Sequence, residues 1–180
     1  MNTDNMTLSG ETIDYGPCAF MDAYNPRTVF SSIDHMGRYA YANQPNIAQW
    51  NLARLAETML PLLDDEIENA ADTIEEVVNG FGALYKDKWL SMMRAKLGLF
   101  GARAEDESLI TDLLGWMQQV GADYTNTFQH LTEEKPPQGE PYNDRAFKEW
   151  YTHWQAQLAK NTKPLKSSLS LMRANNPAVI

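Results

Sequence analysis

The sequence predicts a mainly α-helical protein with one short β-hairpin near its first residue. From residue 45 onward, apolar residues recur every three to four positions, which is the period of an amphipathic helix. Pro, Asn, Asp and Gly stand at the expected helix beginnings and ends. The hairpin is predicted because Ser9-Gly10 separates two short runs, Thr7-Leu8 and Thr12-Ile13. We expect a single domain over 1–180, with a loop-rich region at 1–44 and a helical region at 45–180.

Composition excludes several classes of protein. The chain has 180 residues, of which 43% are apolar and 22% are charged, as in an ordinary globular domain. A net charge of −9 argues against a nucleic-acid partner or an anionic membrane surface. No run of apolar residues is long enough to span a bilayer. A single cysteine, Cys18, leaves no disulfide framework, so we expect a cytoplasmic protein.

Two helices are expected over the first half of the helical region. Pro45 suits the first turn of a helix, and Pro61 is expected to end or kink it. The second helix begins at the acidic run 64–66 and ends before Gly98, with basic residues near its end that complement the helix dipole. Asn79-Gly80-Phe81-Gly82 resembles a glycine-rich loop but lies inside the apolar stripe, so we expect helix there. That stripe comprises Ile67, Ala70, Ile74, Val77, Phe81, Leu84, Trp89 and Met92.

A third and a fourth helix follow. The third is expected from about Glu105 to Val120, with Gly121 as its C-cap. Asp123 is placed to cap a short fourth helix that runs through Leu131. The inward face of the third helix is predicted to comprise Leu109, Ile110, Leu113, Leu114 and Met117.

The last two helices flank a surface loop and a short connection. Residues 133–141 read as a loop because of their Pro and Gly content. Asn143 or Asp144 is expected to cap a helix to about Lys160, and Pro164 to begin the final one. The buried side of the fifth helix is predicted to comprise Phe147, Trp150, Tyr151, Trp154 and Leu158.

The predicted hairpin brings two oxygen ligands together. With Ser9-Gly10 as the turn, Asn5 stands opposite Asp14, and opposed residues of an antiparallel pair share a face. An amide oxygen beside a carboxylate suits Mg²⁺ that arrives with a polyphosphate. A register slip of one residue would separate them. From the residues alone, the polar run Asn2-Thr3-Asp4-Asn5 also fits a simple Asx turn.

Two motifs resemble those of protein kinases, which hold metal ions with a catalytic-loop Asn and the Asp of an Asp-Phe-Gly motif. Asp4-Asn5 and Asp14-Tyr15-Gly16 are similar to these elements, although here Asp and Asn are adjacent instead of five residues apart. The longer strings closely resemble the selenoprotein O (YdiU) family, specifically over residues 1 to about 63. Those strings are Met1-Asn2-Thr3-Asp4-Asn5-Met6, Thr12-Ile13-Asp14-Tyr15-Gly16-Pro17, Phe20-Met21-Asp22-Ala23-Tyr24, Gly37-Arg38-Tyr39, Gln44-Pro45 and Trp50-Asn51-Leu52-Ala53-Arg54-Leu55.

The resemblance implies a kinase-like fold in which these residues belong to the helical C-lobe. It implies transfer of AMP from ATP to Ser, Thr or Tyr hydroxyls of proteins, with ATP reversed relative to ordinary kinases. By motif, Asp4 corresponds to the general base. Asn5 and Asp14 correspond to the ligands of Mg²⁺ or Mn²⁺ and thereby to nucleotide-binding residues.

The family's N-lobe would precede residue 1 and its C-terminal part would follow residue 180, so we expect a fragment that is inactive alone. Its partners in the complete protein would be ATP and protein substrates, with no nucleic acid and no membrane. The exposed inter-lobe surface is expected to favour self-association. Two alternatives stay open: a kinase-like phosphotransferase lobe, and a non-catalytic helical scaffold or interaction fragment.

The spacing of the histidines and of the single cysteine indicates no metal site or catalytic site. His35, His130 and His153 lack metal-ligand spacing and are expected at the surface or in hydrogen bonds. Cys18 is expected to be a packed thiol instead of a nucleophile.

Overall fold

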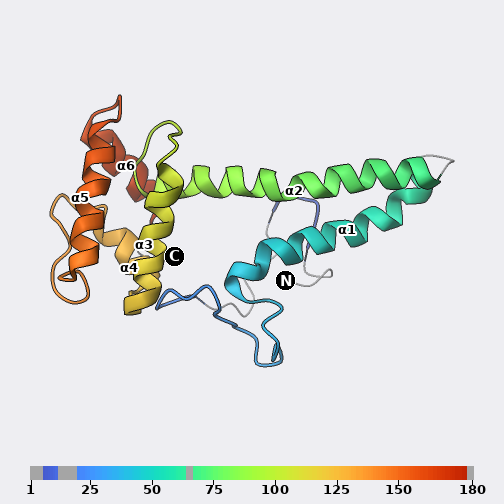
Figure 1. Ribbon diagram of the computed structural model, residues 1–180, viewed down its shortest axis with the longest axis horizontal. Coiled ribbons are helices and arrows are strands. Elements are labelled where there is room, and N and C mark those ends of the chain that lie inside the picture. Colours follow the sequence, from blue (N-terminus) through green and yellow to red (C-terminus); the bar gives the residue numbers. More distant parts are fainter. Residues whose placement is uncertain (1–5, 12–19, 64–66, 178–180) are drawn as a thin grey trace. The chain divides into compact units, whose positions relative to one another are not determined.

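The computed structural model describes residues 6–11, 20–63 and 67–177, and in these it is mainly helical (Figure 1). The chain forms two compact units: Met1–Phe20 with Pro26–Asp87, and Met21–Asn25 with Lys88–Ile180. Within the described ranges there is no β-strand, and an isolated antiparallel bridge joins Ala23 to Asp123. The mainly α class is therefore confirmed.

The expected hairpin stays a prediction. Residues 8–11 form bends, and Thr7 Oγ1 lies 2.9 Å from Ser9 Oγ, whose oxygen also accepts from the backbone N–H of Glu11 at 3.2 Å. Residues 12–14, which would form the second arm, lie outside the described residues, as does Asn5.

The first unit consists of the 3-10 helix η2 (Tyr41–Asn43), helix α1 (Gln44–Leu63) and most of helix α2 (Ile67–Lys96). Pro61 lies in the last turn of α1, as expected of a residue that ends a helix. The two helices are joined by a hydrogen bond of 3.0 Å from Gln49 Nε2 to the carbonyl oxygen of Val78. Gly80 and Gly82 lie inside α2, which confirms that this stretch is not a loop.

Little of this first unit is buried. Of its described residues, Ile47, Asn51 and Ala70 are buried. The apolar stripe of α2 is not buried as a whole, because Val77 is 72% exposed and Leu84 is 58% exposed. The helical period was therefore predicted correctly, but Val77 and Leu84 are not covered within the described part of the unit.

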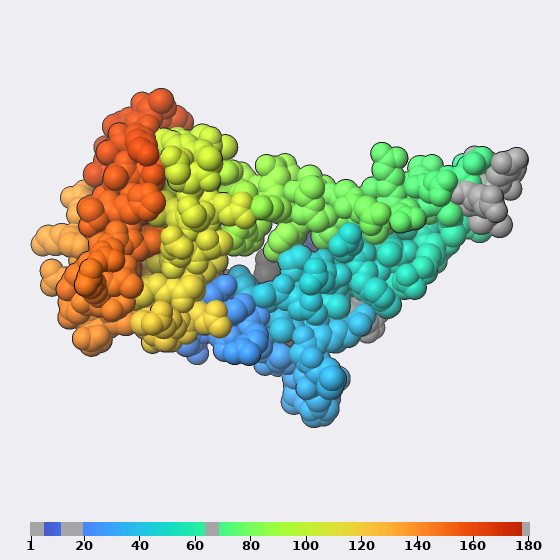
Figure 2. Space-filling view, in the orientation of Figure 1, coloured from blue at the N-terminus to red at the C-terminus, as the bar shows by residue number. Residues whose placement is uncertain are grey.

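The second unit contains the last turns of α2 and helices α3 (Asp106–Val120), α4 (Tyr124–His130), α5 (Arg145–Ala159) and α6 (Leu165–Asn175). Helices α3 and α5 form its most extensive helix–helix contact, and their atoms touch in the space-filling view (Figure 2). The core includes these largest buried side chains: Met93, Leu97, Leu109, Ile110, Leu113, Met117, Phe128, Leu131, Phe147 and Met172.

The helix ends of the second unit agree with those predicted from the sequence, with one difference. Gly121 ends α3 in the left-handed conformation at φ 66°, and Asp123 Oδ1 accepts from the backbone N–H of Asn126 at 2.7 Å. Asp144 occupies the N-cap position of α5 without a capping hydrogen bond. Its carboxylate instead accepts from Trp116 Nε1 at 2.8 Å, which ties the start of α5 to α3.

A buried ion pair connects the end of α2 to the start of α3. Arg94 Nε donates to Asp106 Oδ2 at 2.6 Å, and the backbone N–H of Arg103 donates to the same oxygen at 2.9 Å. Asp106 is fully buried, whereas the Arg94 side chain is 15% exposed. Close packing continues at Gly98, where a Cβ would lie 2.8 Å from Sδ of Met172 on α6.

Candidate functional site

The sequence predicts chemical roles for Asp4, Asn5 and Asp14. These three residues lie outside the described residues, as does Cys18. Their assignments therefore stay predictions. What the structure does describe is the continuation of the first motif at residues 6–11 and the helix, α1, on which it rests. Within the described ranges, no cluster of three or more His, Cys, Asp or Glu side chains is arranged to hold a metal ion.

The segment that follows Asn5 packs on α1. Nδ2 of Asn51 donates to Sδ of Met6 at 2.8 Å, and Asn51 is only 5% exposed. Together with α1, residues 6–8 line a cavity of about 370 Å³. Its wall is mostly apolar, and its polar members are Thr7, Asn51, Arg54 and Thr58. The residue adjacent to the candidate metal ligand is thus held by a buried amide.

The loop between the second motif and α1 is ordered by hydrogen bonds to one carboxylate. Asp34 accepts from the backbone N–H groups of Arg38 and Tyr39 at 2.9 and 2.7 Å. Further on, the backbone N–H of Tyr41 donates to the carbonyl of Thr28 at 3.0 Å. Acceptance of two successive N–H groups by a single Asp is typical of a tight, preformed turn.

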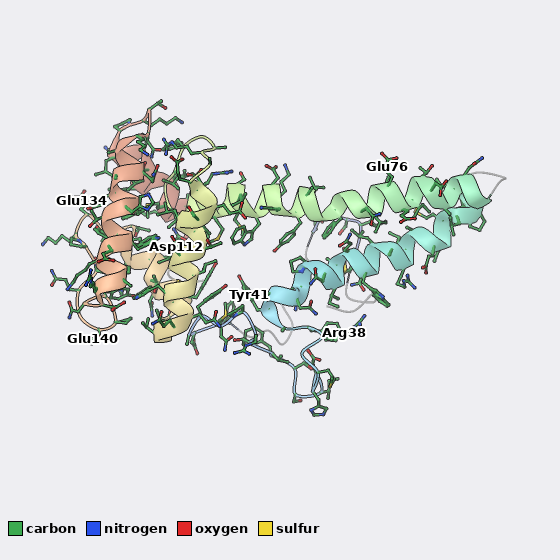
Figure 3. The ribbon with its side chains drawn as sticks, viewed as in Figure 1. Arg38, Tyr41, Glu76, Asp112, Glu134 and Glu140 are labelled. Atoms are coloured by element: carbon green, nitrogen blue, oxygen red, sulfur yellow. The ribbon has the colours of Figure 1, made fainter. Side chains whose placement is uncertain are left out.

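The guanidinium groups of Arg38 and Arg54 lie over the ring of Trp50 on α1. The Cζ atom of Arg38 lies 4.6 Å from the Trp50 ring centroid, and that of Arg54 lies 5.2 Å from it. Trp50 is 41% exposed, and Arg38 lies in the loop that precedes η2 (Figure 3). Contacts at this distance are favourable cation–π interactions. This arrangement places positive charge in a unit that is otherwise acidic, since residues 1–20 and 26–87 contain 13 acidic and four basic residues.

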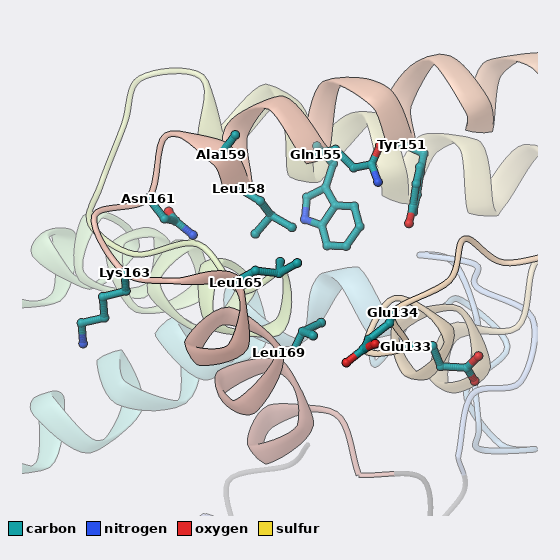
Figure 4. A pocket seen from close by; sticks show the side chains of 11 residues that line it. Glu133, Glu134, Tyr151, Gln155, Leu158, Ala159, Asn161, Lys163, Leu165 and Leu169 are labelled. Atoms are coloured by element: carbon teal, nitrogen blue, oxygen red, sulfur yellow. The ribbon is translucent and has the colours of Figure 1, made fainter.

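A second cavity, of about 380 Å³, lies between α5, α6 and the loop after α4 (Figure 4). Its floor is apolar and includes Trp154, which is 3% exposed, and Leu169, which is 6% exposed. Glu134 points toward Leu169, and Lys163 lies at the far end of the pocket (Figure 4). The sequence did not indicate this cavity, because its lining residues come from separate segments between residues 133 and 169 that only the fold brings together.

The second unit also contains a small hydrogen-bond network. The hydroxyl of Tyr142 lies 3.2 Å from Thr127 Oγ1 and 3.1 Å from Nδ1 of His130. Burial raises the pKa of Tyr142, and the carboxylate of Asp123 adds to the rise. Nε2 of His153 lies 3.2 Å from Gln157 Nε2, so both of these histidines are in hydrogen bonds, as expected. The contacts of Tyr142 link helix α4 to the segment that precedes α5.

None of the helices that the structure describes is long and apolar enough to cross a membrane.

Comparison with known proteins gives first the class of protein and then the family. Three curated relatives called "Protein nucleotidyltransferase YdiU" match all 180 residues: those of Nitrosococcus oceani at 63% identity, Clostridium botulinum at 58% and Alcanivorax borkumensis at 57%. The chain therefore has the sequence of a nucleotidyltransferase segment. A family model described as "Protein adenylyltransferase SelO" also matches residues 1–180. The chain belongs to this SelO family, which confirms the resemblance drawn from the motifs. It spans 36% of the length of the Nitrosococcus relative and 37% of the other two.

Proposed function

We propose that this chain supplies the general base and the metal ligands of a protein adenylyltransferase. The family match over all 180 residues carries the proposal, since it includes both motifs at residues 1–17. The packing of Met6 against α1 supports it, because a catalytic segment needs a fixed support. In this proposal the 180 residues form part of the helical C-lobe of a kinase-like fold.

The donor set fits a hard divalent cation. Asn5 offers an amide oxygen and Asp14 a carboxylate, which are oxygen ligands that Mg²⁺ and Mn²⁺ accept alongside phosphate oxygens and water. When bound, the cation neutralises charge that develops on the phosphate oxygens during transfer. The chain's part is to present these two oxygens together with the nucleotide's phosphates.

Asp4 takes the role of the base. Its carboxylate removes the proton from a Ser, Thr or Tyr hydroxyl of the acceptor protein, whose oxygen then forms a bond to the α-phosphorus of ATP. The bond between the α-phosphorus and the bridging α–β oxygen breaks, and pyrophosphate leaves. Positioning of the hydroxyl in line with the leaving group supplies most of the effect, so Asp4 needs no perturbed pKa.

The remaining expectations on partners belong to the same proposal. ATP and proteins are the partners, and neither nucleic acid nor membrane takes part, in keeping with the net charge of −9. The isolated chain is inactive, cytoplasmic and prone to self-associate through exposed apolar residues such as Val77 and Leu84.

A chimaera tests the proposal. In it, these 180 residues replace the matching 36% of the Nitrosococcus oceani relative, to which they are 63% identical. We expect label transfer to a generic protein acceptor from [α-³²P]ATP and none from [γ-³²P]ATP. Asp4→Ala and Asp14→Ala should each lower transfer at least 100-fold, whereas Asp112→Ala, an exposed residue of α3, should leave it unchanged.

Two results would favour the alternatives. Transfer from [γ-³²P]ATP that Asp14→Ala abolishes would mean a phosphotransferase. Transfer from neither nucleotide, in a chimaera that is folded, would leave a helical scaffold.

A further inference from the structure

We propose that the cavity between α5, α6 and the loop after α4 binds a basic side chain, Lys or Arg, of another polypeptide. The inference concerns the second unit alone and goes beyond the proposed transfer of AMP. It rests on the aromatic and apolar floor of the cavity, on an unpaired carboxylate above that floor, and on the negative charge of the chain (Figure 4).

The floor of the cavity is held in place by the fold. Trp154 is 3% exposed, and its Nε1 donates to the carbonyl oxygen of Leu97 at 2.9 Å, which fixes the indole ring. The ring centroid of Tyr151 lies 5.2 Å from that of Trp154, so two aromatic rings border the same space, together with Leu158 and Leu169. Such a floor suits the aliphatic stem of a Lys or Arg, and aromatic rings also attract its cationic head.

The charge that the cavity offers to a ligand is negative. Glu134 points toward Leu169 in Figure 4, and its exposed carboxylate has no ion pair or hydrogen bond among the described residues. Lys163, at the far end of the pocket, is already engaged, because its Nζ lies 4.5 Å from the ring centroid of Phe100. A cation is therefore the complementary head group.

The amide of Asn161, which also lines the cavity, is used by the fold. Its Nδ2 donates to the carbonyl oxygen of Gly98 at 2.9 Å and to Oγ of Ser168 at 3.0 Å. Its Oδ1 accepts from the backbone N–H of Phe100 at 3.2 Å. Both amide protons are thus taken, so Asn161 offers no donor to an anionic ligand.

The openness of the cavity favours a side chain that a larger molecule presents. Its volume of about 380 Å³ accommodates a single long side chain, and several lining residues are exposed, including Gln155, Ala159 and Leu165. A small ligand is usually buried almost completely, which this open site does not provide. Arg beside Trp and Tyr is also a frequent combination at the centre of protein interfaces. The net charge of −9 further attracts a basic partner.

A peptide titration of the 180-residue chain, followed by NMR, tests the proposal. The probe is the blocked peptide acetyl-Gly-Leu-Arg-Leu-Gly-amide. We expect saturable shifts with a single Kd at the Trp154 indole N–H and the Leu169 amide, and none at the amide of Asp112, an exposed residue of α3. The same peptide with citrulline in place of Arg keeps the shape without the charge, and should bind at least tenfold more weakly.

Variants of the chain test each part of the site. Glu134→Gln removes the charge at constant size and should raise the Kd at least fivefold. The matched control is Glu140→Gln, an exposed residue of the same loop that does not line this cavity, and it should leave the Kd within twofold. Leu165→Ala shortens a side chain that is 58% exposed at the cavity, and should raise the Kd about threefold with the circular dichroism spectrum unchanged.

Four results would overturn the inference. Absence of shifts at Trp154 and Leu169 would mean that the cavity takes no such side chain. Equal affinity for the Arg and citrulline peptides would mean that charge is not recognised, and equal effects of Glu134→Gln and Glu140→Gln would reduce recognition to net charge. If propylguanidine, the arginine side chain alone, bound as tightly as the peptide, the site would serve a small cation instead of a polypeptide. None of these results bears on the transfer of AMP, because the variants lie outside the residues assigned to it.

Discussion

Removal of the Asp106 carboxylate should destabilise the second unit more than any exposed charge would. In Asp106→Ala, Arg94 loses its carboxylate partner at 2.6 Å, and the N–H of Arg103 loses its acceptor. Loss of one partner of a buried ion pair costs about 3–5 kcal/mol. The Arg94 side chain is 15% exposed, so water relieves part of its cost and the lower end, about 3 kcal/mol, applies.

This free energy converts into a measurable shift. For a chain of this size, about 3 kcal/mol lowers the midpoint of thermal unfolding by about 6–12 °C. Circular dichroism at the helical minimum during heating measures it. The matched control is Glu149→Ala, which breaks the pair between Arg145 and Glu149, whose side chains are 91% and 64% exposed. Water screens an exposed pair, so this midpoint should move by no more than about 3 °C, half of the smallest shift expected for Asp106→Ala.

Ionic strength gives a second check on the same pair. Salt screens exposed charges but hardly reaches a buried pair, so the effect of Asp106→Ala should persist in 1 M NaCl. If Asp106→Ala and Glu149→Ala lower the midpoint equally, or if salt removes the difference, the buried pair does not join α2 to α3 as described.

Three further predictions concern packing, pH and assembly. Gly98→Ala should lower the free energy of unfolding, measured in urea, by about 3 kcal/mol or more, because its Cβ would meet the side chains of α6. Gly121→Ala has open space around its Cβ and should lower it by only about 1 kcal/mol. Equal losses in the two variants would refute the close approach at Gly98. Since burial raises the pKa of Tyr142 above its ordinary value of 10.0, the unfolded chain loses this proton first, and stability should fall as pH rises above about 10. Tyr142→Phe should flatten that fall and cost about 1 kcal/mol at neutral pH, and unchanged steepness would contradict the assignment. The double variant Val77→Ser/Leu84→Ser should lower the weight-average mass in sedimentation equilibrium, and an unchanged mass would exclude this face from self-association.

Helices α3 to α6 could be predicted from the sequence because their ends carry local signals. Gly121 and Asp123 act within a few residues of themselves, through the left-handed conformation and through a side-chain hydrogen bond, and both were assigned correctly. Asp144 also stands at the N-cap of α5, but its carboxylate accepts from the Trp116 indole, 28 residues away. A partner so distant in sequence leaves no local signal.

Burial along α2 shows the limit of periodicity. The stripe assigned Met92 to the apolar face, yet Met92 is 50% exposed and its neighbour Met93 is 1% exposed. At 100° per residue Met92 lies only about 20° around the helix from Ile67, so drift of the stripe does not explain its exposure. The partner changes instead: from Lys88 onward α2 belongs to the second unit, whose core buries Met93. Periodicity also cannot tell whether a partner covers the face.

The candidate site was predicted from sequence motifs more than from physical reasoning. Pairing of Asn5 with Asp14 needed an assumed hairpin register, whereas the strings around them identified the family, which the matches then confirmed. The contact between Asn51 and Met6 had no signal in the sequence, although Asn51 lies in one of the matching strings. It depends on the burial of Asn51 in the folded helix and joins residues 45 positions apart.

Binding of Mg²⁺-ATP tests most directly whether Asn5 and Asp14 hold the nucleotide's metal ion. Titration calorimetry of the chimaera gives the affinity, with Asn5→Ala/Asp14→Ala compared with a control pair of exposed residues, Asn46→Ala/Asp112→Ala. We expect the Kd to rise at least tenfold in the first double variant and to stay within twofold of wild type in the second. Equal affinity in both double variants and the wild type would contradict the assignment of these two residues as metal ligands.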